Sequence, residues 1–197
     1  MPVSTEDVKK LRAMTGAGMM DVKHALEETD GNLDKAADLL RERGIAKAAK
    51  KAGREAKEGF VGSYVHHNGK TATLVELNCE TDFVAMNDSF KELAKNLAIH
   101  IAMANPTYRS REDVPESLVE AERKTLAEQA KAEGKPEAVV AKMVEGRLGK
   151  FFQEICLLEQ PYIKDDKKTI EQLVNEAVAT LGENIRIGSF CRIAIGE

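Results

Sequence analysis

The histidines of this chain are its side chains best suited to acid–base or metal chemistry, but their positions predict neither. His66 and His67 are adjacent at the end of a predicted strand, so their side chains point to opposite faces and make a poor metal site. His100 lies near the apolar face of a predicted helix, where we expect a packed or half-exposed histidine. His24 lies in a small helical region. Carboxylate pairs are common, but none is tied to a nucleophile and a base.

The cysteines and the glycine-rich stretch do not indicate catalysis either. The chain has an odd number of cysteines and no C-x-x-C pair, so we expect buried, reduced thiols at Cys79, Cys156 and Cys191. The stretch TGAGMM (15–20) lies between two predicted helices rather than after a strand, so it does not predict a dinucleotide-binding loop. No HExxH, GxSxG or Walker sequence occurs. The chain is therefore not predicted to be an enzyme.

Large apolar side chains at positions that should meet water are the remaining signal. The stretch NCETDFVAMND (78–88) connects an apolar predicted strand to a periodic predicted helix, and it places Phe83 in the connection. Met19 and Met20 stand together at the start of another predicted helix, beside a core too small for both. Pattern alone leaves two interpretations of these residues: local core, or a contact patch for a partner protein. It predicts a binding protein without identifying the partner.

Composition sets the broad class. The chain has 197 residues, enough for one ordinary domain and a small satellite. Lys and Arg number 29 against 33 Asp and Glu, and the net charge of −4 argues against general, direct binding of nucleic acid. The N-terminus lacks the features of a signal peptide, and no run approaches the ~20 apolar residues of a membrane span. We therefore expect a soluble, cytoplasmic protein without a membrane partner.

Residues 1–45 predict a bundle of three short helices, followed by a basic linker. Apolar residues at helical spacing place these helices between Ser4 and Gly44, and Gly44 is expected to end the third. Residues 46–59 are rich in alanine and lysine. They indicate a solvated helix or a flexible tether, or else a cationic strip that faces a partner.

Residues 60–197 predict the core of an α+β protein. Asn68–Gly69 is a hairpin turn signal, and a final alternating strand would complete a small three-stranded antiparallel sheet covered on one face by helices. Two long helices joined by a tight turn should form a projecting antiparallel hairpin. The expected elements are hairpin strands 60–78, helix 88–104, helical hairpin 115–155, loop 160–166, helix 170–181 and strand 184–195. One face of that last strand is expected to carry Ile185, Ile187, Cys191, Ile193 and Ile195.

Five stretches of the sequence resemble the bacterial elongation factor Ts family, in a short form with a single core subdomain. They are TGAGMMD (15–21), IAKAAKKA (45–52), NCETDFVA (78–85), EGRLGKF (145–151) and LEQPY (158–162). They follow the family's order across nearly the whole chain, so the resemblance is specific. Met86 stands where the family often has a basic residue. The long forms of the family have two related core subdomains, whereas this chain holds one.

The resemblance implies a guanine-nucleotide exchange factor for the translational GTPase elongation factor Tu, with no cofactor. It also implies that residues 1–45 are ubiquitin-associated-like in fold and dock on the nucleotide domain of the GTPase. The family's Thr-Asp-Phe-Val tip wedges near the Mg²⁺ site of the GTPase. Carried onto this chain, Phe83 is the wedge, Asp82 is its polar companion, and Thr81 and Val84 shape the loop.

Four further residues are assigned by the same resemblance to the contact made by the N-terminal module. They are Arg12, Met19, Met20 and Lys51. A homodimer is also expected, because one core subdomain presents half of the surface of the long forms and a small sheet has edges to protect. The sheet is the favoured interface and the helical hairpin the other candidate. The alternative function is a helical adaptor for ubiquitin-like or other proteins, in which Phe83 would belong to the core.

Overall fold

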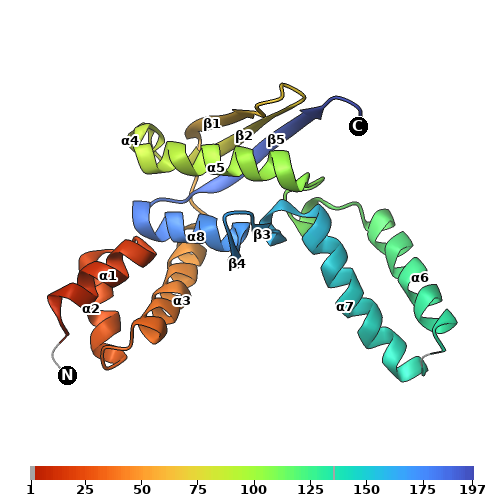
Figure 1. Ribbon diagram of the computed structural model, residues 1–197, viewed down its shortest axis with the longest axis horizontal. Coiled ribbons are helices and arrows are strands. Elements are labelled where there is room, and N and C mark those ends of the chain that lie inside the picture. Colours follow the sequence, from red (N-terminus) through yellow and green to blue (C-terminus); the bar gives the residue numbers. More distant parts are fainter. Residues whose placement is uncertain (1–2, 135) are drawn as a thin grey trace. The chain divides into compact units, whose positions relative to one another are not determined.

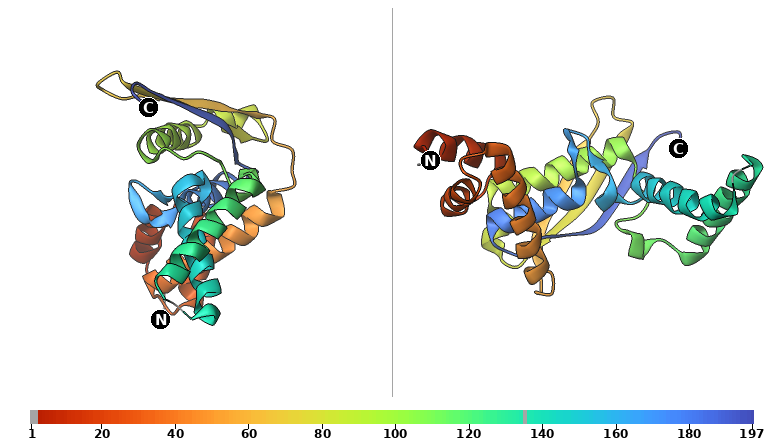
Figure 2. Two further views of the ribbon diagram at one scale, coloured as in Figure 1. Left: turned by 90° about the vertical axis from the view of Figure 1, so that its right-hand side faces the viewer. Right: turned by 90° about the horizontal axis from the view of Figure 1, so that it is seen from below.

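The structure is a computed structural model that describes residues 3–134 and 136–197 (Figures 1 and 2). Helices and strands are mixed along the chain, which confirms the predicted α+β class. The chain separates into two compact units, each assembled from segments that are distant in sequence. Unit 1 comprises residues up to 63, 74–97 and 172–190, and unit 2 comprises residues 64–73, 98–171 and 191–197.

A bundle of three helices forms the N-terminal part of unit 1. The helices are α1 (Thr5–Thr15), α2 (Met19–Glu28) and α3 (Leu33–Lys51). The Ser4 side chain caps α1 by accepting a hydrogen bond from the backbone N–H of Asp7. The helices enclose a small apolar core made by Leu11, Val22, Ala25, Leu26, Ala36 and Leu40. Such a core contributes little stability by itself, so the bundle depends on the rest of the unit.

The prediction that Gly44 ends the third helix is wrong, because α3 continues to Lys51. Gly44 is buried inside the helix, and a Cβ built on it would lie 3.6 Å from the Cβ of Ala179. This glycine therefore marks a close approach to another helix instead of a stop. The first residues of the expected linker extend α3, and Ala48 among them is buried. The proposed division into 1–45, 46–59 and 60–197 remains a prediction.

Three strands form the main sheet, in the order β1-β2-β5. They are β1 (Glu58–Val65), β2 (Thr71–Cys79) and β5 (Arg186–Ala194). Two hydrogen bonds between these segments show that β5 runs antiparallel to β2. The N–H of Ile195 bonds to the carbonyl of Lys70, and Ser189 bonds to the side chain of Glu76.

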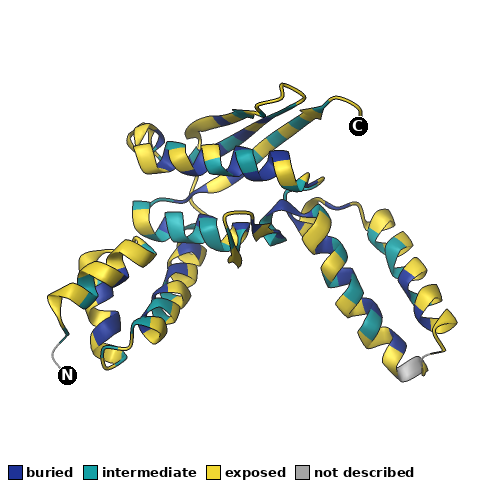
Figure 3. Ribbon diagram, viewed as in Figure 1, coloured by how far each residue is buried: buried dark blue, intermediate teal, exposed yellow. Residues whose placement is uncertain are grey.

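Helix α5 (Asp88–Ala104) lies along one face of this sheet (Figures 1 and 2). In unit 1, a Cβ on Gly62 would come within 2.4 Å of the carbonyl oxygen of Ala94, so β1 needs a glycine there. In unit 2, the Thr73 hydroxyl donates to the carbonyl of Ala98. Buried and exposed positions alternate along α5 with helical spacing (Figure 3), and its buried residues include Phe90, Leu93, Leu97 and Ile101. Helix α8 (Ile170–Leu181) buries Ile170, Val174 and Val178.

The prediction for the faces of the last strand is wrong in part. Ile187 is buried, as is Ile185 just before β5, whereas Cys191, Ile193 and Ile195 are exposed. Within β5, the less exposed residues have odd numbers before Gly188 and even numbers from Gly188 onward. A Cβ on Gly188 would meet the carboxylate of Glu76, and the next residue, Ser189, donates its N–H and its hydroxyl to the same carboxylate. Two successive residues that face one side chain interrupt the period of two.

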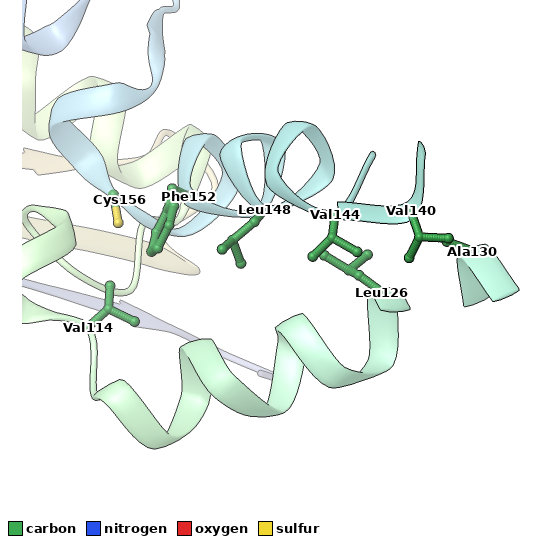
Figure 4. Packing of buried hydrophobic residues seen from close by; sticks show 8 residues of the cluster. All are labelled: Val114, Leu126, Ala130, Val140, Val144, Leu148, Phe152 and Cys156. Atoms are coloured by element: carbon green, nitrogen blue, oxygen red, sulfur yellow. The ribbon is translucent and has the colours of Figure 1, made fainter. Parts of the chain in front are cut away.

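Unit 2 contains a pair of long helices, α6 (Glu116–Ala132) and α7 (Glu137–Ile155). Their facing side chains make a core of their own, together with Val114 before α6 and Cys156 after α7 (Figure 4). It is made by Val114, Leu126, Ala130, Val140, Val144, Leu148, Phe152 and Cys156. The guanidinium of Arg111 lies over the ring of Phe152, 4.6 Å from its centroid, and pairs with the carboxylate of Glu159. These contacts connect the C-terminal end of α7 to the segment that precedes α6.

The expected loop 160–166 contains strand residues, so that prediction is wrong. Strands β3 (Pro161–Tyr162) and β4 (Asp165–Thr169) pair antiparallel, and 3₁₀ turns lie at Arg111–Asp113 and Leu157–Glu159. His100 is packed as expected. It is buried, and its Nε2 lies 3.0 Å from the side-chain oxygen of Gln160.

Cys79 and Cys156 are buried and free, as predicted, whereas Cys191 is free but exposed. Its exposure follows from the same change of side along β5. Within residues 3–134 and 136–197, no helix is both long and apolar enough to cross a membrane.

Candidate partner-binding surface

Residues 81–84 do not form the predicted loop. They begin a short helix, α4 (Asp82–Met86), in unit 1. Thr81 is the N-cap residue, with extended backbone, and its hydroxyl oxygen accepts a hydrogen bond from the N–H of Val84. The N–H of Ala85 bonds to the carbonyl of Thr81, which closes the first turn. A threonine followed by residues without Gly or Pro is compatible with such a turn. The turn is too short, however, for its apolar residues to show a helical period in the sequence.

Phe83 is 83% exposed, so its interpretation as a local core residue is wrong. Asp82 is also exposed, Val84 is half-buried, and Ala85 is buried. Met86 is exposed as well and lies three residues after Phe83, on the neighbouring position of the same helical face. The helix therefore fixes itself to the unit through its small residue and presents its two large apolar side chains to solvent.

Thr81 is held through all of its polar groups. Its N–H donates to Oε2 of Glu183 at 3.0 Å, and its hydroxyl donates to Oε1 of the same carboxylate at 2.6 Å. The carbonyl accepts the thiol of Cys79 at 3.1 Å. Burial, and after it the nearby Glu183 carboxylate, raises the pKa of Cys79 to about 11, so the thiol keeps its proton at neutral pH.

A second acidic residue, Glu80, connects the same two chain segments in the opposite direction. Oε1 of Glu80 accepts the N–H of Asn184 at 2.6 Å, and the N–H of Glu80 donates to Glu183 at 3.0 Å. The side-chain amide of Asn184 donates to the carbonyl of Arg54 at 2.7 Å, and the guanidinium of Arg54 lies 3.5 Å from Glu80. Asn184 is buried, so each of these bonds lies where an unpaired polar group would be costly.

The N-terminal residues singled out by the resemblance are placed in the bundle. Arg12 is exposed in the last turn of α1, and Met19 and Met20 are 56% and 62% exposed at the start of α2. The interpretation that places one methionine in the core and the other at its edge is therefore wrong. Lys51 is half-buried at the end of α3. Met14 is also exposed, at 58%, although it lies three residues after the buried Leu11, at the spacing of one helical face.

The end of α8 lies against two parts of the bundle. A Cβ on Gly16, in the α1–α2 connection, would lie 3.6 Å from Oγ1 of Thr180. A Cβ on Gly182 would lie 3.9 Å from Nζ of Lys51. The next residues, Glu183 and Asn184, make the bonds to Thr81 and Arg54 described above. Residues 180–184, which we call the α8 junction, thus contact both sequence regions assigned to the partner.

Sequence reasoning missed the α8 junction altogether. Glu183 follows a helix stop and precedes a strand, in a segment with no periodic pattern, and it lies 102 residues after Thr81. Nothing local in the sequence distinguishes it from the other glutamates of the chain. Glu80 lay inside the stretch 78–88, next to Thr81, and was the one available hint. In the part of the chain that the structure describes, no group of three or more His, Cys, Asp and Glu side chains could hold a metal ion.

Comparison with known proteins identifies a single family. A family model described as elongation factor TS matches residues 4–197. An elongation factor Ts of Nitratidesulfovibrio vulgaris is 55% identical over 196 residues, which cover 100% of this chain and 98% of that protein. One of Syntrophomonas wolfei is 55% identical, covering 99% of this chain and 91% of that protein. One of a Thermoanaerobacter species is 56% identical, with coverages of 99% and 96%. This chain is therefore similar in length to these relatives.

Proposed function

This chain belongs to the elongation factor Ts family, and from that premise we infer that it is a guanine-nucleotide exchange factor for the translational GTPase elongation factor Tu. The observation in the molecule that supports this role best is Phe83, which is 83% exposed on a helix whose N-cap residue, Thr81, is hydrogen-bonded to Glu183 through its N–H and its hydroxyl. A large aromatic held rigidly in solvent is a side chain built to enter a partner.

Exchange of this kind needs no covalent chemistry. A GTPase that holds GDP at about nanomolar affinity stabilises the complex by about 12 kcal/mol. The factor must bind the nucleotide-free GTPase more tightly than the GDP-bound one. By linkage, the same free energy weakens GDP on the GTPase and weakens the factor when GDP is bound. The protein therefore acts as a binding partner and not as an enzyme that changes substrates, and it requires no cofactor.

We propose that residues 81–84 act near the Mg²⁺ site of the GTPase. Bound Mg²⁺ offsets the charge of the phosphates, so a group that displaces it loosens the nucleotide. Phe83 would be the wedge and Asp82 its exposed polar companion. Thr81 and Val84, which are the N-cap and the half-buried third residue of the turn, would set the direction of Phe83.

The bundle α1–α3 would supply a second contact. We propose that it has a ubiquitin-associated-like fold and docks on the nucleotide domain of the GTPase through Arg12, Met19, Met20 and Lys51. Two exposed, adjacent methionines suit this role, because their unbranched side chains adapt to an irregular apolar surface. The cytoplasm, where the GTPase works, is the compartment this function requires.

We also propose that two copies of the chain associate through the outer face of the sheet. In unit 2 that face exposes Val65, Ile193 and Ile195, and Cys191, two residues before Ile193, is exposed as well. A second copy would cover these side chains, which are otherwise a liability for a soluble protein. Sedimentation equilibrium that gives a monomer at micromolar concentration would reject this arrangement. A disulfide between two Cys191 residues would be optional in a reducing compartment.

The test of the exchange function is release of a fluorescent GDP analogue from elongation factor Tu, with and without this protein. Acceleration at substoichiometric amounts of the factor is expected, because each molecule leaves when GTP enters. A helical adaptor, which is the alternative, would bind partners without accelerating release and would be indifferent to changes at residues 81–84. The exposure of Phe83 removes the support for the adaptor that a core role would have given.

A further inference from the structure

The start of α4 is held by a residue from a distant part of the chain. One oxygen of the Glu183 carboxylate accepts the N–H groups of Glu80 and Thr81, each at 3.0 Å. Its other oxygen accepts the Thr81 hydroxyl at 2.6 Å. Glu80 returns the interaction, since its carboxylate accepts the N–H of Asn184. Two acidic residues about a hundred positions apart thus tie the same two chain segments together through backbone groups.

These bonds matter because α4 cannot hold its own shape. An isolated helix of this length is not stable in water, where nucleation costs more than one turn of hydrogen bonds returns. The direction of Phe83 must therefore come from what fixes the ends of the turn. Ala85 fixes one side by burial. The other fixed point is Thr81, and Glu183 bonds to two of its three polar groups.

We propose that Glu183 is a positioning residue for exchange, which acts through Thr81 on the direction of Phe83 and does not itself touch the GTPase nucleotide site. This inference rests on the proposed exchange function. A wedge that is already ordered loses less conformational entropy on binding than one that must be ordered in the complex. Loss of Glu183 should leave the apolar side chain present but poorly directed, so exchange should slow while the fold persists.

Glu183 can be tested separately from Phe83 by a double-mutant cycle. The four proteins are the wild type, Glu183→Ala, Phe83→Ala and the double variant, each measured for release of the GDP analogue and for melting temperature. Glu183→Ala is expected to slow catalysed release about tenfold when Phe83 is present. It should slow release by less than about twofold when Phe83 is already absent, because interacting sites are not additive. The change in melting temperature should be the same in both backgrounds.

Two further variants separate positioning from general stability. Asp113→Ala is a matched control in unit 2, since that carboxylate also accepts the N–H and the hydroxyl of a single residue, Ser110. It should lower the melting temperature without slowing exchange. Glu183→Gln should recover most of the exchange rate, because the amide oxygen can still accept the two backbone N–H groups. If Glu183→Ala proves unstable, Thr81→Val removes the hydroxyl bond to Glu183 in its place, and it should also slow exchange.

The results distinguish a failure of the exchange function from a failure of the positioning role of Glu183. A wild-type protein that does not accelerate GDP release would reject the exchange function itself. An active wild type with an equally active, folded Glu183→Ala would overturn only the positioning role. So would equal slowing by Glu183→Ala in the presence and absence of Phe83, or equal slowing by Asp113→Ala. Slowing that depends on Phe83 and recovers with glutamine is the result expected from the structure.

Discussion

Two helix starts in unit 1 both present large apolar side chains to solvent, but they are built differently. Helix α4 begins at Thr81, whose side chain caps the turn and whose N–H and hydroxyl bond to Glu183. Helix α2 begins after Gly18, and no side chain caps it there. The first carries Phe83, a stiff ring, and the second carries Met19 and Met20, which are flexible. The exposed fractions are 83%, 56% and 62% respectively.

The difference corresponds to two ways of using apolar surface. A ring on a braced turn loses little entropy when it enters a pocket, so it can serve as an anchor whose position matters. Methionines on an uncapped helix start can adjust to the partner and tolerate error in position. We therefore expect α4 to set the rate of exchange and the start of α2 to contribute to affinity.

Replacement of Phe83 by alanine should have the largest effect. Catalysed GDP release should fall by one to two orders of magnitude, because truncation of an aromatic anchor costs about 2–4 kcal/mol and tenfold corresponds to about 1.4 kcal/mol. Free energy of unfolding should change by less than about 0.5 kcal/mol, since the side chain is exposed. Both quantities are to be measured on one preparation. A destabilised variant whose folded fraction exchanges at the wild-type rate would refute the wedge.

Replacement of both Met19 and Met20 by alanine should have a smaller effect, of about three- to tenfold, because most contacts outside an anchor are worth little individually. The loss should appear mainly as a higher concentration of factor needed for half-maximal release. Alanine is a good helix former, so α2 itself should persist by circular dichroism. Met14→Ala, a methionine of similar exposure on α1, is the matched control. If Met14→Ala slows GDP release as much as replacement of Met19 and Met20 does, then the two methionines do not form a specific contact patch.

Asp82→Ala should weaken exchange less than Phe83→Ala, by about two- to fivefold, because an exposed rim charge contributes chiefly to the association rate. The effect should shrink as salt is raised, since screening acts on exposed charges. Release rates at low and high ionic strength check this. A loss independent of salt, or as large as that of Phe83→Ala, would mean that Asp82 is buried against the partner and has more than a companion role.

Amide hydrogen exchange compares the two helix starts without any mutation. The N–H of Thr81 is bonded to Glu183, whereas the first N–H groups of an uncapped helix have no intrahelical partner. We expect Thr81 to exchange at least about tenfold more slowly than Met19 and Met20, as bonded amides open less often. Residues 3–50 as a whole should also exchange faster than residues 60–197. Uniform protection would remove the contrast between the two helix starts.

The long amphipathic elements could be read from the sequence, and the short ones could not. The expected helices 88–104 and 170–181 coincide with α5 and α8, because each repeats its apolar spacing over several turns. Helix α4 and strand β3 are shorter than two periods, and β4 has the sequence DDKKT, which does not alternate between apolar and polar residues, so no pattern marks them. Gly44 was misjudged because a glycine at a helix end and a glycine under a crossing helix look the same in sequence.

The sequence by itself determined the class of the fold and the family, and through the family resemblance it supplied the proposal that Thr81, Asp82, Phe83 and Val84 contact the partner. The motif is local, and its residues are neighbours in the chain. Only the tertiary structure decided that Phe83 is exposed and that Glu183 holds the turn that carries it. Burial and side-chain hydrogen bonds across 102 positions depend on how distant segments pack, and no local pattern encodes that.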